Sequence, residues 1–161
     1  MTEEVAAILS TWRVNNNTNL LLLESIPKEG LLLQPSGPRA RNIAQVLAHL
    51  HQTRIGWTRW HDPASTAGIK RFEKGTIPSR ADLKRALKSS ADMVESFLER
   101  AFQGKAKIKS FQKQPLRFMT YLIMHEAHHR GQIIFALKQA GIRLPRAASE
   151  NLWKQWFWGK E

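Results

Sequence analysis

Residues 125–132 carry the side chains of this sequence whose types and spacing could do chemistry. The run reads His-Glu-Ala-His-His-Arg-Gly-Gln and holds three of the six histidines of the chain. His125 and His129 are four residues apart, so on a helix they lie on one face, about a turn from each other, and can share a metal ion through neutral imidazole nitrogens. Burying two imidazoles side by side without partners would be costly. The spacing therefore indicates a metal site, with two satisfied core histidines as the plainer alternative.

The residues around this pair indicate which way it faces. At 100° per residue, His128 falls on the flank of the helix and is expected to be a non-ligand or a neighbour of the ligands. Four apolar residues share the stripe of the pair: Phe118, Leu122, Ile133 and Ala136. The two histidines are therefore expected where the core should be.

Length and composition limit the class of protein. With 161 residues, of which 42% are hydrophobic, residues 1–161 are expected to form one domain with a proper core. The chain has no cysteine, which excludes disulfides and thiolate ligands, so any thiol chemistry must use a thiol brought by another molecule. It begins with Met-Thr-Glu-Glu rather than a signal-type run, and no apolar segment is long enough to span a bilayer. We expect a cytoplasmic protein without a membrane partner.

Hydrophobic periodicity predicts four long amphipathic helices and no strand. The second has a strong start signal, because Asn42 can cap it and Gln45 can return the hydrogen bond in a capping box. The first could be irregular where three asparagines follow one another, at 15–17. The leucines at 31–33, between the first two helices, are expected to dock on the core. The predicted helices cover residues 3–25, 42–60, 79–104 and 115–141.

Four such helices imply an all-α four-helix bundle, and bundles build metal sites from inward-facing side chains on neighbouring helices. Catalytic zinc takes three protein ligands and keeps an open position. The third ligand is expected in the second helix, where His49 and His51 flank the apolar stripe on opposite sides. Periodicity prefers His49 only slightly. His61, at the end of that helix, is expected to be exposed.

Two apolar surfaces predict further packing. The aromatic C-terminal tail, residues 152–158, is expected to pack on the bundle or on a second subunit. The fourth helix also carries apolar residues opposite its histidines, which predicts a homodimer through this helix, or else a neighbour within the chain that covers the face. These residues are Leu116, Met119, Ile123, Ala127, Ile134 and Leu137.

The net charge of +12 and the pI near 10.6 favour an anionic partner: nucleic acid, a membrane surface or a small acidic substrate. Residues 105–113 form a lysine-rich loop that is expected to be a solvated surface, because aromatic residues that would stack on bases are sparse there. The known nucleic-acid-binding motifs are absent. A non-enzymatic nucleic-acid-binding module is thus an alternative supported by charge alone, and no specific nucleic acid is expected.

At the level of the whole chain, the sequence resembles a known family. Leu47-Ala48-His49-Leu50, then His125-x-x-x-His129 followed at once by Arg130-Gly131-Gln132, then Gly141 and Pro145, is similar to the DinB/YfiT-like metal-dependent bundles. The resemblance implies four helices, frequent dimers, and His49, His125 and His129 as ligands of zinc, nickel or a related divalent ion. It also implies a transferase or isomerase that acts on a small molecule with a low-molecular-weight thiol such as bacillithiol or mycothiol.

An ion held by three neutral imidazoles would lower the pKa of a bound water or thiol. Glu126 is a candidate base or partner of a ligand, and an ion pair between helices is the alternative for it. Arg130 and Gln132 could orient the substrate or fasten helices together.

The same residues also match a motif of another enzyme class. His125-Glu126-x-x-His129 is the H-E-x-x-H of zinc metalloproteases, in which the glutamate is the base, and Glu150 could supply a third ligand. The glycine of the extended protease motif is missing, and no strand is predicted to align a peptide. A zinc hydrolase therefore remains the second interpretation.

Overall fold

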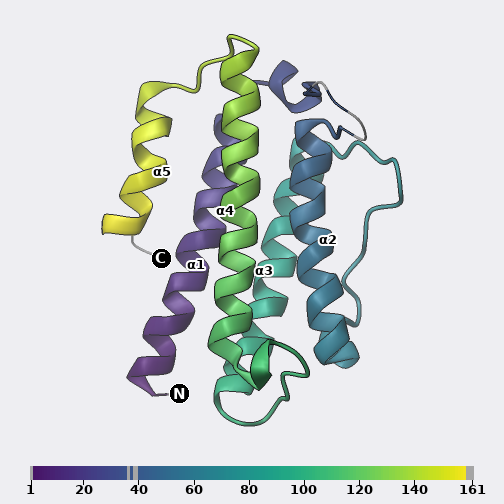
Figure 1. Cartoon of the computed structure of the whole chain (residues 1–161), viewed down its shortest axis with the longest axis vertical. Coiled ribbons are helices and arrows are strands. Elements are labelled where there is room, and N and C mark those ends of the chain that lie inside the picture. Colours follow the sequence, from purple (N-terminus) through teal and green to yellow (C-terminus); the bar gives the residue numbers. More distant parts are fainter. Residues whose placement is uncertain (1, 36, 38–39, 159–161) are drawn as a thin grey trace.

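The structure, a computed structural model, describes residues 2–35, 37 and 40–158, and in that part its regular secondary structure is helical, with no strand (Figure 1). Short 3-10 turns occur at Glu29–Leu32, Pro63–Thr66 and Phe111–Lys113. The α-helices are α1 (Glu3–Ser25), α2 (Ile43–His61), α3 (Arg80–Phe102), α4 (Pro115–Gln139) and α5 (Arg146–Trp158). The first four form the predicted four-helix bundle. None of the described helices is both long and apolar enough to cross a membrane.

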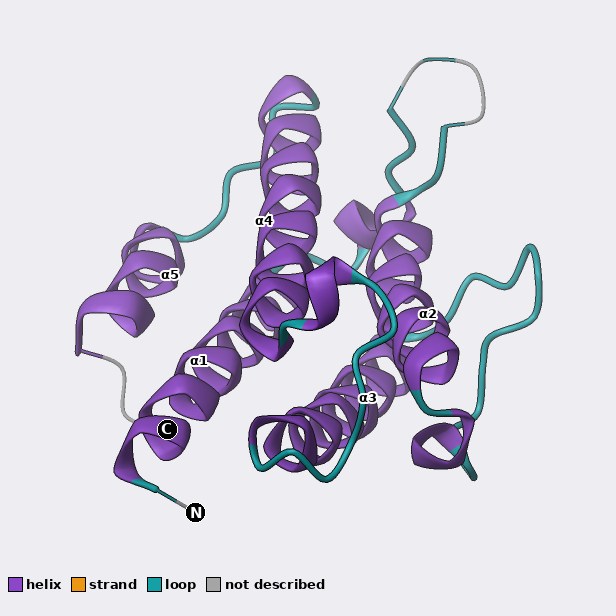
Figure 2. Ribbon diagram, turned by 60° about the horizontal axis from the view of Figure 1, so that its bottom comes forward, coloured by secondary structure: helices purple, strands orange, loops and turns teal. Residues whose placement is uncertain are grey.

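The four helices of the bundle run up, down, down and up (Figure 1). His51 contacts the carbonyl of Ala86 and Arg54 that of Leu87, so residue numbers rise together along α2 and α3, and these two helices are parallel. The long connection 62–79, which returns along the outside of α2, makes this possible. Figure 2 shows α4 beside both α1 and α2. Residues of α2 and α4 can therefore meet across one interface.

The helix starts are those that the sequence predicts. The Asn42 side chain accepts a hydrogen bond from the Gln45 amide, and the Gln45 side chain accepts one from the Asn42 amide, which completes the capping box. Ser79 caps α3 in a similar way, and Pro115 is the first residue of α4. These local signals fix the residues at which α2, α3 and α4 begin.

A layer of buried polar side chains crosses the bundle at mid-height. Arg54 of α2 is fully buried and forms an ion pair with Glu126 of α4, with Nε 2.7 Å from Oε1 and Nη2 2.9 Å from Oε2. The guanidinium of Arg54 lies over the ring of Trp12, 4.9 Å from its centroid. Its Nη1 also donates to Asn16 Oδ1, Ser90 Oγ and the Leu87 carbonyl. This layer separates two apolar parts of the core, which lie towards either end of the bundle.

The asparagines of α1 belong to this layer. Asn15 and Asn19 each donate from Nδ2 to Glu126 Oε2 at 2.6 Å, and each accepts from Arg130 Nη1, at 2.8 and 2.7 Å. Because these amides find partners on α4, they do not compete for the backbone of their own helix. The irregularity that the sequence allowed at 15–17 is therefore absent, and α1 is continuous.

The C-terminal tail packs on the bundle only in part. It forms α5, which packs against α1 and buries Leu152. Most of its aromatic side chains stay exposed, with Trp153 at 70% and Trp158 at 75%. Of the three leucines after α1 that were expected to dock on the core, two do so. Leu31 is buried and Leu33 is partly buried, but Leu32 is 62% exposed.

The face of α4 opposite its histidines is covered in part within the chain, which is one of the two alternatives for it, because Met119 and Leu137 are buried in the bundle. One expectation about exposure is wrong. His61 is buried rather than exposed, and its ring packs against the rings of Phe97 and Phe118. The loop before α4 covers this helix end, with the Lys109 amide donating to Nδ1 of His61 and the Phe111 ring packed against it.

The buried ion pair generates a stability prediction. Glu126→Ala leaves Arg54 charged and without its carboxylate in the core, so the free energy of unfolding should fall by roughly 3–5 kcal/mol. Replacing both residues by leucine should cost less than Glu126→Ala, because no charge is then left buried. Chemical denaturation measures both values.

Glu24→Ala is the matched control. It removes a glutamate from an ion pair with Lys84 in which both side chains are over 40% exposed. The loss should be less than about 1 kcal/mol. An equal loss in Glu24→Ala and Glu126→Ala would contradict the structural importance of the buried pair.

Candidate metal centre

Three histidines from two helices converge on one side of the bundle. His125 and His129 project from successive turns of α4, and His49 projects from α2 opposite them. One nitrogen of each ring lies within 4.8 Å of those of the other two. All three side chains are partly buried. The antiparallel packing of α2 on α4 brings together residues that are 76 or more positions apart in sequence.

The spacing of these nitrogens fits a metal ion. The Nε2 atoms of His125 and His129 are 3.2 Å apart. Two nitrogens bound to zinc at tetrahedral angles and ordinary bond lengths are about 3.3 Å apart. The ring of His49 faces both, with centroid distances of 5.2 Å to His125 and 5.0 Å to His129. Three imidazoles are also the number of protein ligands that catalytic zinc sites use.

Gln132 orients one of the rings. Its Oε1 lies 2.8 Å from Nδ1 of His129, so that Nδ1 carries the proton and Nε2 keeps its lone pair for an ion. The amide of Gln132 lies 2.8 Å from Nε2 of His128. His128 is exposed and stands outside the cluster, which agrees with its predicted place on the flank. Nδ1 of His125 is buried without a hydrogen-bond partner among the described residues.

The surroundings keep these rings neutral. Burial, together with the charges of His129, Arg41 and His125, lowers the pKa of His49 to about 4. Burial also lowers the pKa of His125 and of His129. Neutral imidazole is the form that binds a metal ion, so at neutral pH the cluster is ready to bind one without releasing protons.

The structure decides which histidine of α2 lies with the pair. His51 points to the opposite side of the helix, where Nδ1 lies 2.9 Å from the Ala86 carbonyl and Nε2 lies 2.9 Å from the Lys70 carbonyl. Both nitrogens are therefore engaged by the backbone. His49 joins the cluster instead, as the resemblance implied.

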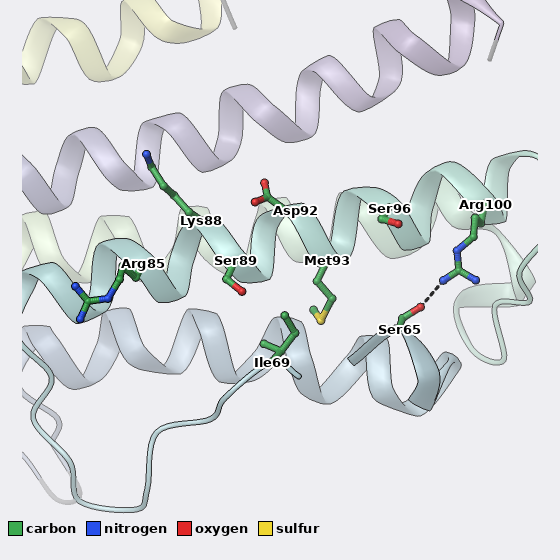
Figure 3. A pocket seen from close by; sticks show the side chains of 9 residues that line it. All are labelled: Ser65, Ile69, Arg85, Lys88, Ser89, Asp92, Met93, Ser96 and Arg100. Atoms are coloured by element: carbon green, nitrogen blue, oxygen red, sulfur yellow. Dashed lines mark hydrogen bonds between the residues drawn. The ribbon is translucent and has the colours of Figure 1, made fainter. Parts of the chain in front are cut away.

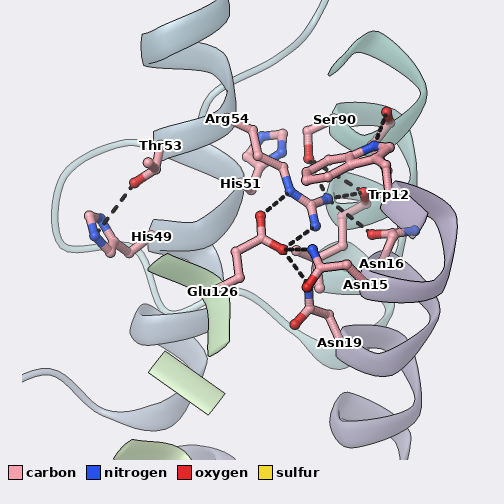
Figure 4. Close-up of polar contacts among 12 residues, drawn as sticks. Trp12, Asn15, Asn16, Asn19, His49, His51, Thr53, Arg54, Ser90 and Glu126 are labelled. Atoms are coloured by element: carbon pink, nitrogen blue, oxygen red, sulfur yellow. Dashed lines mark hydrogen bonds and ion pairs between the residues drawn. The ribbon is translucent and has the colours of Figure 1, made fainter. Parts of the chain in front are cut away.

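Glu126 and Arg130 face the other way from the histidines. Figure 4 shows the Glu126 carboxylate directed at Arg54 and the asparagines of α1, with His49 on the far side. Burial alone would raise the pKa of Glu126, but the charge of Arg54 and the hydrogen bonds it accepts outweigh this and hold its pKa below the usual value. Arg130 is tied to Asn15 and Asn19. For Glu126, this geometry favours an ion pair between helices over the role of a base. For Arg130, it favours the fastening of helices over the orientation of a substrate.

The protease motif is thus present in sequence without its geometry. Its glutamate has both oxygens engaged inside the core. Glu150, the candidate third ligand, lies on α5 and pairs with Arg146 and Lys154 on the surface. It is not part of the histidine cluster. Nothing in this arrangement supports the zinc hydrolase interpretation.

Two cavities border the cluster. One, of about 620 Å³, includes His129, and the other, of about 590 Å³, includes His49. Both are bordered by Ala40 and Arg41 at the start of α2. A third cavity, of about 520 Å³, lies along α3, far from these histidines in the fold, and Arg85 is among the residues that line it (Figure 3). The cluster is thus reachable by a small molecule from two sides.

The sequence interpretation overlooked Arg54, Asn15 and Asn19. Arg54 lies four residues after Leu50 and seven after Leu47, within the apolar stripe of α2. A charged residue in such a stripe signals a buried partner. The four-residue spacing of Asn15 and Asn19 could have indicated a shared contact. Neither signal names Glu126 as the partner, because that depends on how the helices pack.

Comparison with known proteins agrees with the geometry. A family model described as the DinB family matches residues 1–156. A search of curated proteins finds no match. The match covers all four helices of the bundle, both helices that carry the histidine cluster, and nearly all of α5. The chain belongs to the DinB family.

Proposed function

We propose that this chain is a metal-dependent enzyme that acts on a small molecule, with His49, His125 and His129 as the ligands of a divalent ion, zinc or nickel. The observation that carries the proposal is the convergence of three imidazole nitrogens within 4.8 Å, beside two cavities. Membership of the DinB family supports it. An ion bound there would supply Lewis acidity and lower the pKa of a coordinated water or thiol.

We further propose a low-molecular-weight thiol as the co-substrate, in an S-transferase reaction. The chain itself has no cysteine, so the sulfur nucleophile has to come from outside. The three imidazoles are neutral and add no negative charge, which leaves the ion cationic and suited to stabilise a thiolate. In this scheme Gln132 orients His129, and Glu126 and Arg130 are positioning residues that hold α4 in register.

A nucleic-acid-binding module, the non-enzymatic alternative, has less support than a metal-dependent enzyme. Charge is its only argument, and a cavity beside three histidines suits a small ligand rather than a duplex. Binding to duplex DNA should therefore be weak, without sequence preference, and should collapse as the salt concentration rises.

The metal site gives the first test of this proposal. Protein purified without added metal should contain about one equivalent of zinc, nickel or a similar ion by elemental analysis. His49→Ala, His125→Ala and His129→Ala should each lose it, because each removes a nitrogen that the ion needs.

His128→Ala is the control, since it removes an exposed histidine of the same helix that lies outside the cluster. His61 is unsuitable because it is packed in the core. Full occupancy in His125→Ala would refute the site. If His49→Ala kept its full metal content while His51→Ala lost its metal, the third ligand would be His51 rather than His49.

The reaction gives the second test. Metal-loaded protein should join the sulfur of bacillithiol or another small thiol to the carbon of an electrophile that carries a leaving group, with loss of that group and of the thiol proton. The thioether product is read out by mass spectrometry. Removal of the ion by a chelator should abolish the transfer, and restoring the ion should recover it. Turnover that is equal with and without the ion would contradict a metal-dependent transferase.

We also propose that the chain forms a homodimer through α4. Leu116 remains 49% exposed, Ala127 is exposed, and Ile123 is partly buried, which leaves an apolar strip on this helix after the bundle has formed. Light scattering should give twice the 18.5 kDa mass of one chain. Ile123→Lys should shift the protein toward the monomer with its metal retained, whereas Ile77→Lys, at a 52% exposed position outside the helices, should not. A monomeric wild type would refute the dimer.

A further inference from the structure

We propose that the cavity beside His49 is an anion-binding subsite in which Arg41 and Arg71 hold a carboxylate or phosphate group of the small molecule that binds at the histidine cluster. The inference rests on the proposed function, because it names the substrate class of the same site.

The charge of this cavity is the first argument. It lies between the start of α2 and the segment 71–76, has a volume of about 590 Å³, and includes His49 in its wall. Three cationic side chains line it, Arg41, Arg71 and Lys74, against one acid, Glu73. The N-terminus of α2 adds the positive end of its dipole. An anion entering the cavity would therefore be attracted from several sides.

Arg71 is held in place for such a contact. Its Nε donates to Oε1 of Gln52 at 3.1 Å, and Nε2 of Gln52 donates to the Phe72 carbonyl at 2.6 Å. Gln52 thus fixes the guanidinium through one nitrogen. The two terminal nitrogens have no partner among the described residues, and they form the fork that binds carboxylate or phosphate with two hydrogen bonds.

Arg41 connects this cavity to the metal centre. It borders the cavities of both His49 and His129, and no acid of the described chain pairs with it. An anionic group held by Arg41 would therefore lie next to the position where chemistry is proposed.

The cavity on the other side of Arg41 has a different character. Its wall beside His129 is largely apolar, formed by Ile43, Val46, Ile133, Phe135 and Ala136. A ligand that spans both cavities would place an anionic group near Arg71 and an apolar group near Ile133. The substrate class is therefore a small organic acid or phosphate ester with an apolar part.

Three probes of similar size test this inference: phenyl phosphate, phenylacetate and benzyl alcohol. Calorimetric titration of the full-length protein, as purified and after chelator treatment, should show binding of at least one anion, and the tighter anion identifies phosphate or carboxylate. Arg41→Gln and Arg71→Gln should each weaken this binding by about tenfold or more, since each removes a charge-assisted hydrogen bond. The neutral alcohol should bind no better to the wild type than to these variants.

Arg85→Gln is the matched control. It removes the same charge from the cavity along α3 (Figure 3), where Arg85 forms an exposed ion pair with Asp82. Its effect on anion binding should be less than about twofold. Equal effects of Arg85→Gln and Arg41→Gln, or none in Arg41→Gln and Arg71→Gln, would overturn the subsite.

Measuring the metal content distinguishes a failure of the anion-binding subsite from a failure of the proposed metal enzyme. Arg41→Gln should keep the metal content of the wild type, and the difference between Arg41→Gln and Arg85→Gln should persist in chelator-treated protein. A protein that never holds metal but shows this arginine dependence would refute the metal enzyme and support the subsite. A metal-loaded protein without the arginine dependence would refute only the subsite.

Discussion

The ion pair between Arg54 and Glu126 is the interaction on which the rest of the bundle depends. Both side chains are buried, and the surrounding amides of Asn15, Asn16 and Asn19 satisfy their remaining hydrogen bonds. A buried charge that loses its partner costs about 3–5 kcal/mol, so a register that separates Arg54 from Glu126 is strongly disfavoured. The pair therefore fixes the register of α2, α4 and α1 at mid-height.

This register also determines the geometry of the histidine cluster. Glu126 follows His125 in sequence, and Arg130 follows His129, so each residue that anchors α4 in the core adjoins one that projects toward the cavities. A shift of α4 by one turn would move His125 and His129 by about 5.4 Å relative to His49. That displacement exceeds the spread of the three nitrogens. The polar layer and the candidate metal centre are thus two sides of one helix interface.

Part of the positive charge of the chain lies beside the histidine cluster. Arg41, Arg71 and Lys74 gather where α2 begins and where the long connection between α2 and α3 passes it. That connection exists because α2 and α3 are parallel, so the topology itself brings Arg71 near His49. The cationic wall beside the histidines is more informative than the net charge, because it faces a cavity of small-molecule size.

The sequence by itself determined the elements and part of the site. Capping signals at Asn42 and Ser79 located the helices, and the four-residue spacing placed His125 and His129 on one face, because both are local properties of a helix. Periodicity preferred His49 over His51 only slightly, and the position of His61 at a helix end wrongly suggested that it is exposed. The packing of α2 against α4 brought His49 to the pair, and the contacts of the α2 end with α3, α4 and the loop before α4 buried His61, since burial and contact between distant residues arise from the tertiary arrangement. For the same reason the partner of Glu126 proved to be Arg54, 72 positions away, which no local pattern identifies.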